Sequence, residues 1–126
     1  MPEDIIPDDV KQFIQQYLDS IAQWEGLLLM RSETEIPWSA ESLAQRLYIT
    51  PPEAARILER LMATGFLRQD GTQLFSYAAP SPLDASVQDT ADLYKQYLIP
   101  ITHLIHSKSK HRIQAFADAF RLRKDK

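Results

Sequence analysis

The stretch TPPEAARILERLMATG, residues 50–65, predicts a helix with well-marked ends. Thr50 suits the N-cap, Pro51 suits the first helical position, and Glu53 completes a Thr-x-x-Glu capping box. Gly65 is the expected stop at the C-terminal end. The apolar positions recur at helical spacing and are Ala54, Ile57, Leu58 and Leu61. These residues predict a capped helix with one buried face.

Two further helices are expected near the start of the chain. The first has Asp8 or Asp9 as its cap. Its apolar stripe follows the i, i+3, i+4, i+7 pattern and consists of Val10, Phe13, Ile14, Tyr17, Leu18 and Ile21. The second begins at Ser20, which forms a capping-box pattern with Gln23, and its segment 27–30 enters the core.

A short helix directly precedes the 50–65 stretch. Residues 36–38 are expected to be extended, and Ser39 is the N-cap of the helix that follows. Its buried positions are Leu43, Ala44 and Leu47. Ala44 is small, which allows this helix and the next to cross closely. The pair therefore has the outline of a helix-turn-helix.

The segment FLRQDGTQLFSYA, residues 66–78, predicts a β-hairpin. Asp70 and Gly71 form the dipeptide favoured by a two-residue type I′ turn. Counting outward from that turn pairs Gln69 with Thr72 and Leu67 with Leu74. The aromatic residues in and near the hairpin are expected to pack in the core and not to stack on bases; they are Trp38, Phe66, Phe75 and Tyr77.

Beyond the hairpin, Pro80 and Pro82 predict a linker, and a long helix is expected over residues 84–107. Its stripe has the spacing of a helix that packs on a partner helix, and consists of Val87, Ala91, Tyr94, Leu98, Ile101 and Ile105. Pro100 removes one backbone hydrogen bond, so we expect a kink near Ile99.

Charge is distributed unevenly along the chain. Residues 1–107 hold 7 Lys and Arg against 15 Asp and Glu, a balance of −8, whereas residues 108–126 hold 7 against 2, a balance of +5. The C-terminal segment combines this charge with an apolar helical stripe, formed by Ile113, Phe116, Ala117 and Phe120. Three interpretations remain open: closure of the core or contact with a second subunit, docking in a groove of another protein, or contact with an anionic membrane surface.

The composition indicates one ordinary globular domain. The 126 residues are 44% hydrophobic and 25% charged, which is too apolar for a disordered chain. Because cysteine is absent, disulfides and thiolate metal sites are excluded, and a cytoplasmic location is the simplest expectation. The start MPEDIIPDDVK is acidic, unlike a signal peptide, and no apolar run approaches the roughly 18 residues of a membrane span.

Taken in order, residues 20–78 resemble winged helix-turn-helix regulators of the multiple-antibiotic-resistance regulator (MarR) type. The matching segments are SAESLAQRL, ITPPEAARILERLMATGFL and FLRQDGTQLFSYA. The resemblance implies a mainly α-helical fold, with a three-helix core and a β-hairpin wing between flanking N- and C-terminal helices. The expected parts are an N-terminal helix at 1–19, the winged domain at 20–79, and a dimerising extension at 80–126.

The resemblance further implies that the 51–64 helix enters the major groove of DNA while the wing lies on the backbone. Carried over position by position, the candidate DNA-binding residues are Pro52, Glu53, Ala55, Arg56 and Arg60 on the helix, with Arg68 and Gln73 on the wing. Arg56 and Arg60 are four apart and could reach phosphate or guanine together. The basic C-terminal segment is expected to assist, or to serve as an interaction tail, through Lys108, Lys110, Arg112, Phe116, Phe120, Arg121 and Arg123.

The helix also departs from the usual regulator pattern. Its first turns carry Pro, Glu and Ala where such regulators place base-reading Ser, Thr, Asn or Gln. Glu53 faces the expected position of phosphate, and Glu59 offsets Arg60, so the motif alone predicts weak binding with a shallow salt dependence. The arginines could equally form a solvated helix face. A scaffold that binds another protein, with little or no DNA binding, is the alternative function.

Catalysis is not expected. The sequence has neither a Gly-rich phosphate loop nor a cysteine nucleophile, and no Ser, His and acid set that the expected fold would assemble. His103 and His106 are three apart, with His111 nearby, but no well-placed carboxylate completes a metal site. We therefore expect no metal or cofactor, and a homodimeric transcriptional regulator with double-stranded DNA as its partner.

Overall fold

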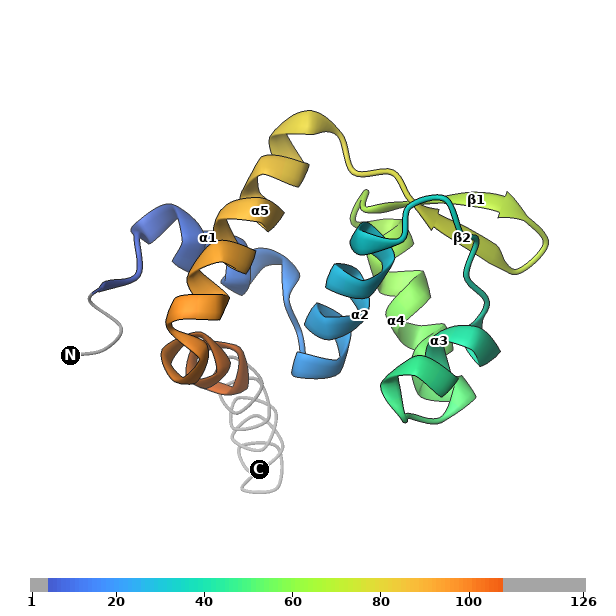
Figure 1. The fold of residues 1–126 in the computed structure, drawn as a ribbon, viewed down its shortest axis with the longest axis horizontal. Coiled ribbons are helices and arrows are strands. Elements are labelled where there is room, and N and C mark those ends of the chain that lie inside the picture. The colour runs from blue at the N-terminus through green and yellow to red at the C-terminus, as the bar shows by residue number, and fades with distance from the viewer. Residues whose placement is uncertain (1–4, 108–126) are drawn as a thin grey trace, which may run out of the picture. The chain divides into compact units, whose positions relative to one another are not determined.

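The computed structural model describes residues 5–107. Its elements, in chain order, are α1 (Asp8–Tyr17), α2 (Ile21–Ser32), α3 (Ala40–Leu47), α4 (Pro51–Ala63), β1 (Leu67–Gly71), β2 (Leu74–Tyr77) and α5 (Ser81–Gln96), followed by a helical segment at 98–107 (Figure 1). The chain divides into two compact units. One contains residues 22–91, and the other contains the residues before and after that range. The expected fold class, a mainly helical winged helix-turn-helix, is confirmed.

The 22–91 unit is built around the crossing of α3 and α4 (Figure 1). Ala44 is buried on α3, and its small side chain lets the two helices pack together. Gly26 on α2 marks a second close approach, because a Cβ there would lie 3.2 Å from Cδ1 of Leu47 and 3.7 Å from that of Leu43. The largest fully buried side chains of this unit include Trp24, Phe66, Leu27, Met30, Leu43, Leu58 and Leu61.

The ends of α3 and α4 follow their capping signals. Oγ of Ser39 accepts from the Ser42 backbone N–H at 3.1 Å, and Oγ of Ser42 accepts from the Ser39 N–H at 3.0 Å. Oγ1 of Thr50 accepts from the Glu53 N–H at 3.3 Å, which confirms Thr50 as the cap of α4. The Glu53 carboxylate does not accept the reciprocal hydrogen bond from the Thr50 backbone N–H, so only half of the predicted capping box is formed.

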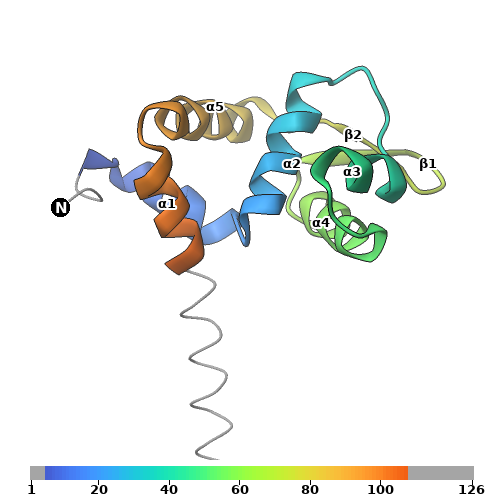
Figure 2. The same ribbon diagram turned by 60° about the horizontal axis from the view of Figure 1, so that its bottom comes forward.

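The hairpin forms, but its predicted register is wrong. Leu67 pairs with Tyr77 and Gln69 with Phe75, and not with Leu74 and Thr72 as predicted. A bulge at Asp70 shifts the register, so that Gly71 pairs with Leu74 and the chain reverses farther on. Gln73, with φ of 65°, takes the left-handed conformation that the prediction assigned to the Asp-Gly pair. In both views the hairpin projects beyond α3 and α4 (Figures 1 and 2).

Trp38, in the loop before α3, joins that loop to strand β2 of the hairpin. Its N–H donates to the Phe75 carbonyl at 2.7 Å, and the Phe75 N–H donates back to the Trp38 carbonyl at 2.9 Å. The indole is buried, as expected for a core aromatic residue. The guanidinium of Arg46 lies over its ring, 5.5 Å from the centroid. These contacts fix the wing to the helix-turn-helix.

The second unit contains α1 and the helical segment 98–107. The predicted Asp cap of α1 is wrong: Pro7 occupies the N-cap, and Asp8 and Asp9 lie in the first turn, where acids interact favourably with the helix dipole. The helix ends at Tyr17, earlier than the stripe predicted, because Leu18 is extended. Among the described residues of this unit, the buried hydrophobic side chains are Ile6, Val10, Phe13, Ile14, Leu18, Ile101 and Ile105.

The single long helix predicted over 84–107 is two helices. Pro82 is not in a linker but occupies the second position of α5, where its missing N–H costs no helical bond. The helix is interrupted at Tyr97, two residues before the predicted kink, and a new helical segment starts at Leu98. Pro100 is thereby placed in the first turn of that segment, where it fits without breaking a bond. No helix in residues 5–107 is long and apolar enough to cross a membrane.

Candidate nucleic-acid interface

The outer face of α4 is defined by what the helix buries. Ala54, Ile57, Leu58 and Leu61 pack inward, so the opposite side of the helix faces solvent. Among the predicted DNA-binding residues of α4, Pro52, Arg56 and Arg60 are exposed, whereas Glu53 and Ala55 are half-buried. The structure therefore brings the two arginines to the surface, one helical turn apart.

Arg56 and Arg60 differ in their contacts, because Arg60 is already engaged in an interaction with another group. Within the described part of the chain, Arg56 is held by no ion pair or hydrogen bond, so its guanidinium is available for an external anion. Glu59 is exposed between the two arginines and supplies a negative charge on the same face. The outer face of α4 thus combines two cations with one acid.

The wing contributes less positive charge than its sequence suggests. Nε of Arg68 donates to Oδ1 of Asp70 at 2.9 Å, so the only cation of the hairpin is neutralised. Ser76 Oγ donates to the other carboxylate oxygen of Asp70. These hydrogen bonds, from Ser76 and then Arg68, lower the pKa of the Asp70 carboxyl. Gln73, the other predicted wing contact, is exposed at the turn.

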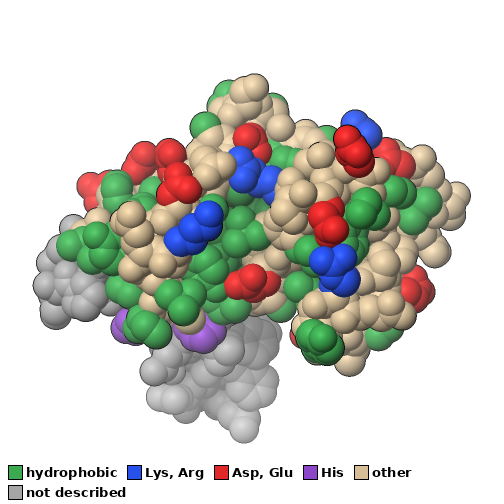
Figure 3. Space-filling view, in the orientation of Figure 1, with side chains coloured by type: hydrophobic (Ala, Val, Ile, Leu, Met, Phe, Trp, Pro, Cys, Tyr) green, Lys and Arg blue, Asp and Glu red, His purple; other side chains and the backbone are tan. Residues whose placement is uncertain are grey.

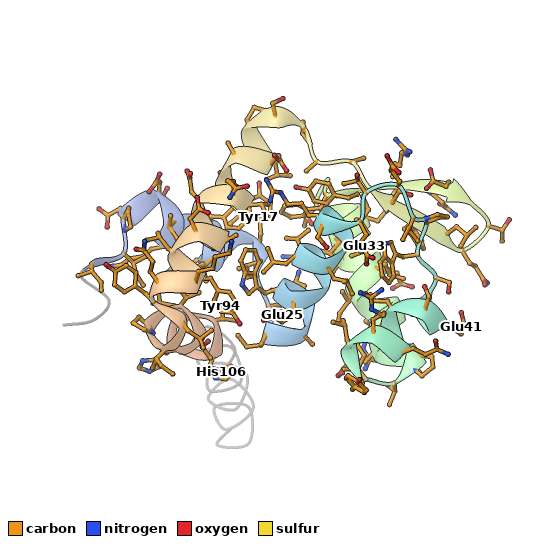
Figure 4. All side chains as sticks on the ribbon, in the orientation of Figure 1. Tyr17, Glu25, Glu33, Glu41, Tyr94 and His106 are labelled. Atoms are coloured by element: carbon orange, nitrogen blue, oxygen red, sulfur yellow. The ribbon has the colours of Figure 1, made fainter. Side chains whose placement is uncertain are left out.

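The remaining arginines of this unit are also engaged by acids. Nη1 of Arg46 lies 3.2 Å from Oε2 of Glu33, which is labelled in Figure 4. Nε of Arg31 lies 2.8 Å from Oδ1 of Asp84. Residues 22–91 hold 5 Arg and no Lys against 9 Asp and Glu, a balance of −4. On the face shown in Figure 3, Lys and Arg side chains form separate spots beside acids and not one basic patch.

A cavity of about 360 Å³ lies between the start of α3, the side of α4 and the wing. Its lining includes Glu41, Ala55, Leu58, Glu59, Gln73 and Phe75. Glu41 projects from the first turn of α3 (Figure 4). Sequence reasoning missed this cavity because the wing residues that line it depend on the hairpin register, which the Asp-Gly signal misplaced.

A second cluster that the sequence did not reveal joins α2, β2 and α5. Asp84 accepts from Nε of Arg31 at 2.8 Å and from the Tyr77 hydroxyl at 2.5 Å, while Nη2 of Arg31 donates to Gln88 at 2.7 Å. Hydrogen bonding from Arg31 and then Tyr77 lowers the pKa of Asp84. Burial, followed by the bond to Asp84, raises the pKa of Tyr77. No local pattern links residues so far apart in the chain.

The other predicted residues lie away from this face or outside the described residues. His103 and His106 are exposed on the 98–107 segment, and no group of three or more His, Asp and Glu in residues 5–107 is placed to hold a metal ion. The predicted interaction tail lies outside the described residues. It consists of Lys108, Lys110, Arg112, Phe116, Phe120, Arg121 and Arg123.

No protein-family model matches the sequence, and comparison with curated proteins gives no match. Comparison with solved structures finds MepR, a transcription regulator of the Staphylococcus aureus multidrug efflux pump MepA, at 12% identity and a TM-score of 0.53, covering 92% of this chain and 86% of that one. It also finds the multiple antibiotic-resistance repressor MarR from Listeria monocytogenes, at 17% identity and a TM-score of 0.52, covering 92% of this chain and 82% of that one. The chain has the MarR fold.

The MarR fold accounts for elements outside the helix-turn-helix as well. Since the similarity covers 92% of the chain, it extends beyond the winged region to the flanking helices. At 12% and 17% identity, however, it carries no information on individual side chains. The binding properties of the face around α4 depend on its own residues.

Proposed function

We propose that this protein is a winged-helix DNA-binding transcriptional regulator. The observation that carries the proposal is the exposed face of α4, with Arg56 and Arg60 one turn apart, in a chain whose MarR fold is that of two transcription regulators. A helix in this position enters the major groove with its outer side chains toward the DNA. Arginine suits both phosphate and guanine, because its planar guanidinium donates two parallel hydrogen bonds.

The negative net charge of the 22–91 unit predicts a modest affinity for DNA. Each neutralised phosphate adds to the binding free energy through counterion release, and here few arginines are available for that role. Arg56 and Arg60 supply the contacts in the groove, and the basic segment 108–126 supplies further phosphate contacts. In this proposal the protein acts in the cytoplasm as a homodimer, which is joined through residues 84–107 and the C-terminal segment. Two winged domains then share one DNA site.

Fluorescence anisotropy with labelled duplex DNA tests the proposal. At about 50 mM salt, the protein should bind both random duplex and the sequence upstream of its own gene, with tighter binding to the latter. Arg56→Ala combined with Arg60→Ala should weaken binding and lower the slope of log affinity against log salt by about 1.8 per subunit, at about 0.9 for each contact.

A matched double variant controls for the loss of charge. Lys11→Ala combined with Lys95→Ala removes the same charge from residues outside the 22–91 unit and should leave affinity and slope nearly unchanged. Equal effects from the two double variants would show that α4 is not the reading element. Absence of binding to either duplex at low salt would favour the alternative, a scaffold that binds another protein.

A further inference from the structure

Tyr48 lies in the turn between α3 and α4 and is the most exposed of the large hydrophobic residues in the described part of the chain (Figure 1). Its side chain is 95% exposed, and no described residue forms a hydrogen bond or a ring contact with it. An aromatic side chain stabilises a fold through the area that it buries, and this one buries almost none. The ring of Tyr48 therefore contributes little to folding.

The backbone of Tyr48 is strained. It has a φ of 58° and a ψ of 44°, the left-handed conformation that suits glycine and costs a bulky residue free energy. The turn requires this conformation, because the N–H groups of Tyr48 and Ile49 both donate to the Ala44 carbonyl, at 3.1 Å from Ile49. Glycine would close the same turn without strain. Folding thus does not explain the tyrosine, and unexplained backbone strain is frequent at functional sites.

The start of α4 has no free backbone donor for a phosphate. Helix N-termini bind phosphate through N–H groups that have no partner in the helix. Here Pro51 and Pro52 lack an N–H, and the Glu53 N–H donates to Oγ1 of Thr50 at 3.3 Å. The Ala54 N–H donates to the Thr50 carbonyl at 3.0 Å. A phosphate beside this end of the helix must therefore be bound by side chains.

The turn lies where a helix-turn-helix meets the DNA backbone. The first helix of the motif crosses the backbone, and the second enters the major groove with its N-terminal end. The turn that joins them is therefore next to the sugar–phosphate chain at the edge of the groove. Tyr48 precedes Thr50, the cap of α4, by two residues, and its hydroxyl is a donor that the start of this helix otherwise lacks.

We propose that Tyr48 binds the DNA backbone: its hydroxyl donates to a phosphate oxygen, and its ring packs on the adjacent sugar. This inference rests on the proposed function and adds a contact outside the exposed face of α4. Contacts to phosphate and sugar fix the register of a protein on the duplex without reading bases. Tyr48 would thereby position Arg56 and Arg60 in the groove.

The contact should be recognisable by its salt dependence. An arginine that neutralises a phosphate releases counterions, so its contribution to affinity falls as salt is added. The phenol of tyrosine is neutral at pH 7 and releases none. The contribution of Tyr48 should therefore be the same at low and at high salt.

Fluorescence anisotropy of the full chain with the labelled upstream duplex tests the contact. Tyr48→Phe removes only the hydroxyl and should weaken binding about fivefold, the loss expected of one neutral hydrogen bond, with an unchanged salt slope. Arg56→Ala, in contrast, should lower the slope by about 0.9. Tyr97→Phe is the matched control, because it removes the hydroxyl of a half-buried tyrosine outside the 22–91 unit, and it should leave affinity unchanged.

Tyr48→Gly separates binding from folding. The change relieves the strained backbone and removes a ring that buries almost nothing, so the midpoint of thermal unfolding should rise by about 4 °C. Because hydroxyl and ring are both lost, DNA affinity should fall at least about tenfold. A variant that is more stable and yet binds more weakly is the result expected of a residue that serves binding.

Three results would count against this contact. Equal DNA affinity of the wild type and both Tyr48 variants would overturn it and leave the regulator proposal intact. A lower unfolding midpoint for Tyr48→Gly would also overturn it, because Tyr48 would then serve the fold. Failure of the wild type to bind either duplex at about 50 mM salt would reject the regulator proposal itself, and the Tyr48 contact with it.

Discussion

Arg31 on α2 and Asp84 on α5 are 53 residues apart in the chain, yet the guanidinium Nε donates to the carboxylate at 2.8 Å. Tyr77 at the end of β2 donates its hydroxyl to the same carboxylate oxygen at 2.5 Å. One carboxylate therefore ties together the second helix, the base of the wing and the start of α5. This cluster holds the start of α5 against α2 and β2.

Replacing Asp84 with Asn should destabilise the fold. The change removes the charge that Arg31 and Tyr77 both face, but about a third of the Asp84 side chain is exposed and water screens the pair. We therefore expect a loss of about 1 kcal/mol in the free energy of unfolding, measured by urea denaturation at neutral pH. The control is Asp89→Asn, which neutralises an exposed acid of the same helix and should change little.

The same cluster predicts a pH dependence. Because the pKa of Asp84 is lower in the folded than in the unfolded state, its stabilisation is fully present above the ordinary value of 3.8 and is lost as pH falls below it. The stability difference between wild type and Asp84→Asn should narrow as unfolding is measured at successively lower pH from 5 to about 2.5. A constant difference across this range would contradict the assignment.

Gly65 should be sensitive to substitution because its φ is +94°. Residues with a side chain rarely adopt this backbone conformation, and a substitution here is therefore strained. Gly65→Ala should cost about 1 kcal/mol of stability through this backbone conformation alone, since the nearest atom to a new Cβ is Leu83 Cδ2 at 3.9 Å. Gly71→Ala is the matched control, since a Cβ there meets nothing within 4 Å and the backbone is not left-handed. Thermal melts that rank the two variants equally would refute this explanation.

Freeing the wing arginine should strengthen the proposed DNA binding. Asp70→Asn removes the acid that neutralises Arg68 while keeping an oxygen that can accept from Ser76. Affinity for duplex DNA should rise at low salt, and the salt slope should steepen by about 0.9 for one new phosphate contact. Asp89→Asn changes the net charge equally, away from the wing, and should leave the slope as it is. If both variants behave alike, the wing does not touch DNA.

The exposed apolar residues after α5 predict the dimer contact. Leu98 is 50% and Ile99 75% exposed at the start of the 98–107 segment. If this segment joins two subunits, Leu98→Asp with Ile99→Asp should shift the mass measured by light scattering from dimer toward monomer. Ile36→Asp places a similar charge at an exposed apolar position of the other unit and should keep the dimer. A monomeric wild-type chain would reject the dimer outright.

The sequence predicted those elements whose signals are local. Ser39, Thr50 and Gly65 act within three or four residues of the helix ends that they define, and all three lie where predicted. The buried stripe of α4 was likewise predicted correctly, because its spacing reports directly on one face of a helix. Fold class followed from the order of these elements.

Competition between local signals explains the errors. Asp-Gly strongly favours a turn, but Asp70 lies at a bulge, where its carboxylate accepts hydrogen bonds from Arg68 and Ser76. The turn then moves to Thr72 and Gln73, although glutamine is uncommon in the left-handed region. The cavity and the Arg31–Asp84 pair depend on contacts between distant segments, which periodicity and spacing do not encode. Exposure of Arg56 and Arg60 was predictable, whereas the neutralisation of Arg68 was not.

The backbone bridge between Trp38 and Phe75 also bears on how the wing behaves in a crowded solution. A two-stranded hairpin has two open edges, and an open edge can recruit strands from other molecules. Here Trp38 occupies the outer edge of β2, so the open edge is that of β1. This edge carries a bulge together with Arg68, Gln69 and Asp70, features that discourage strand addition. The wing is therefore protected on one edge by pairing and on the other by charge and irregularity, which guards an exposed sheet against aggregation.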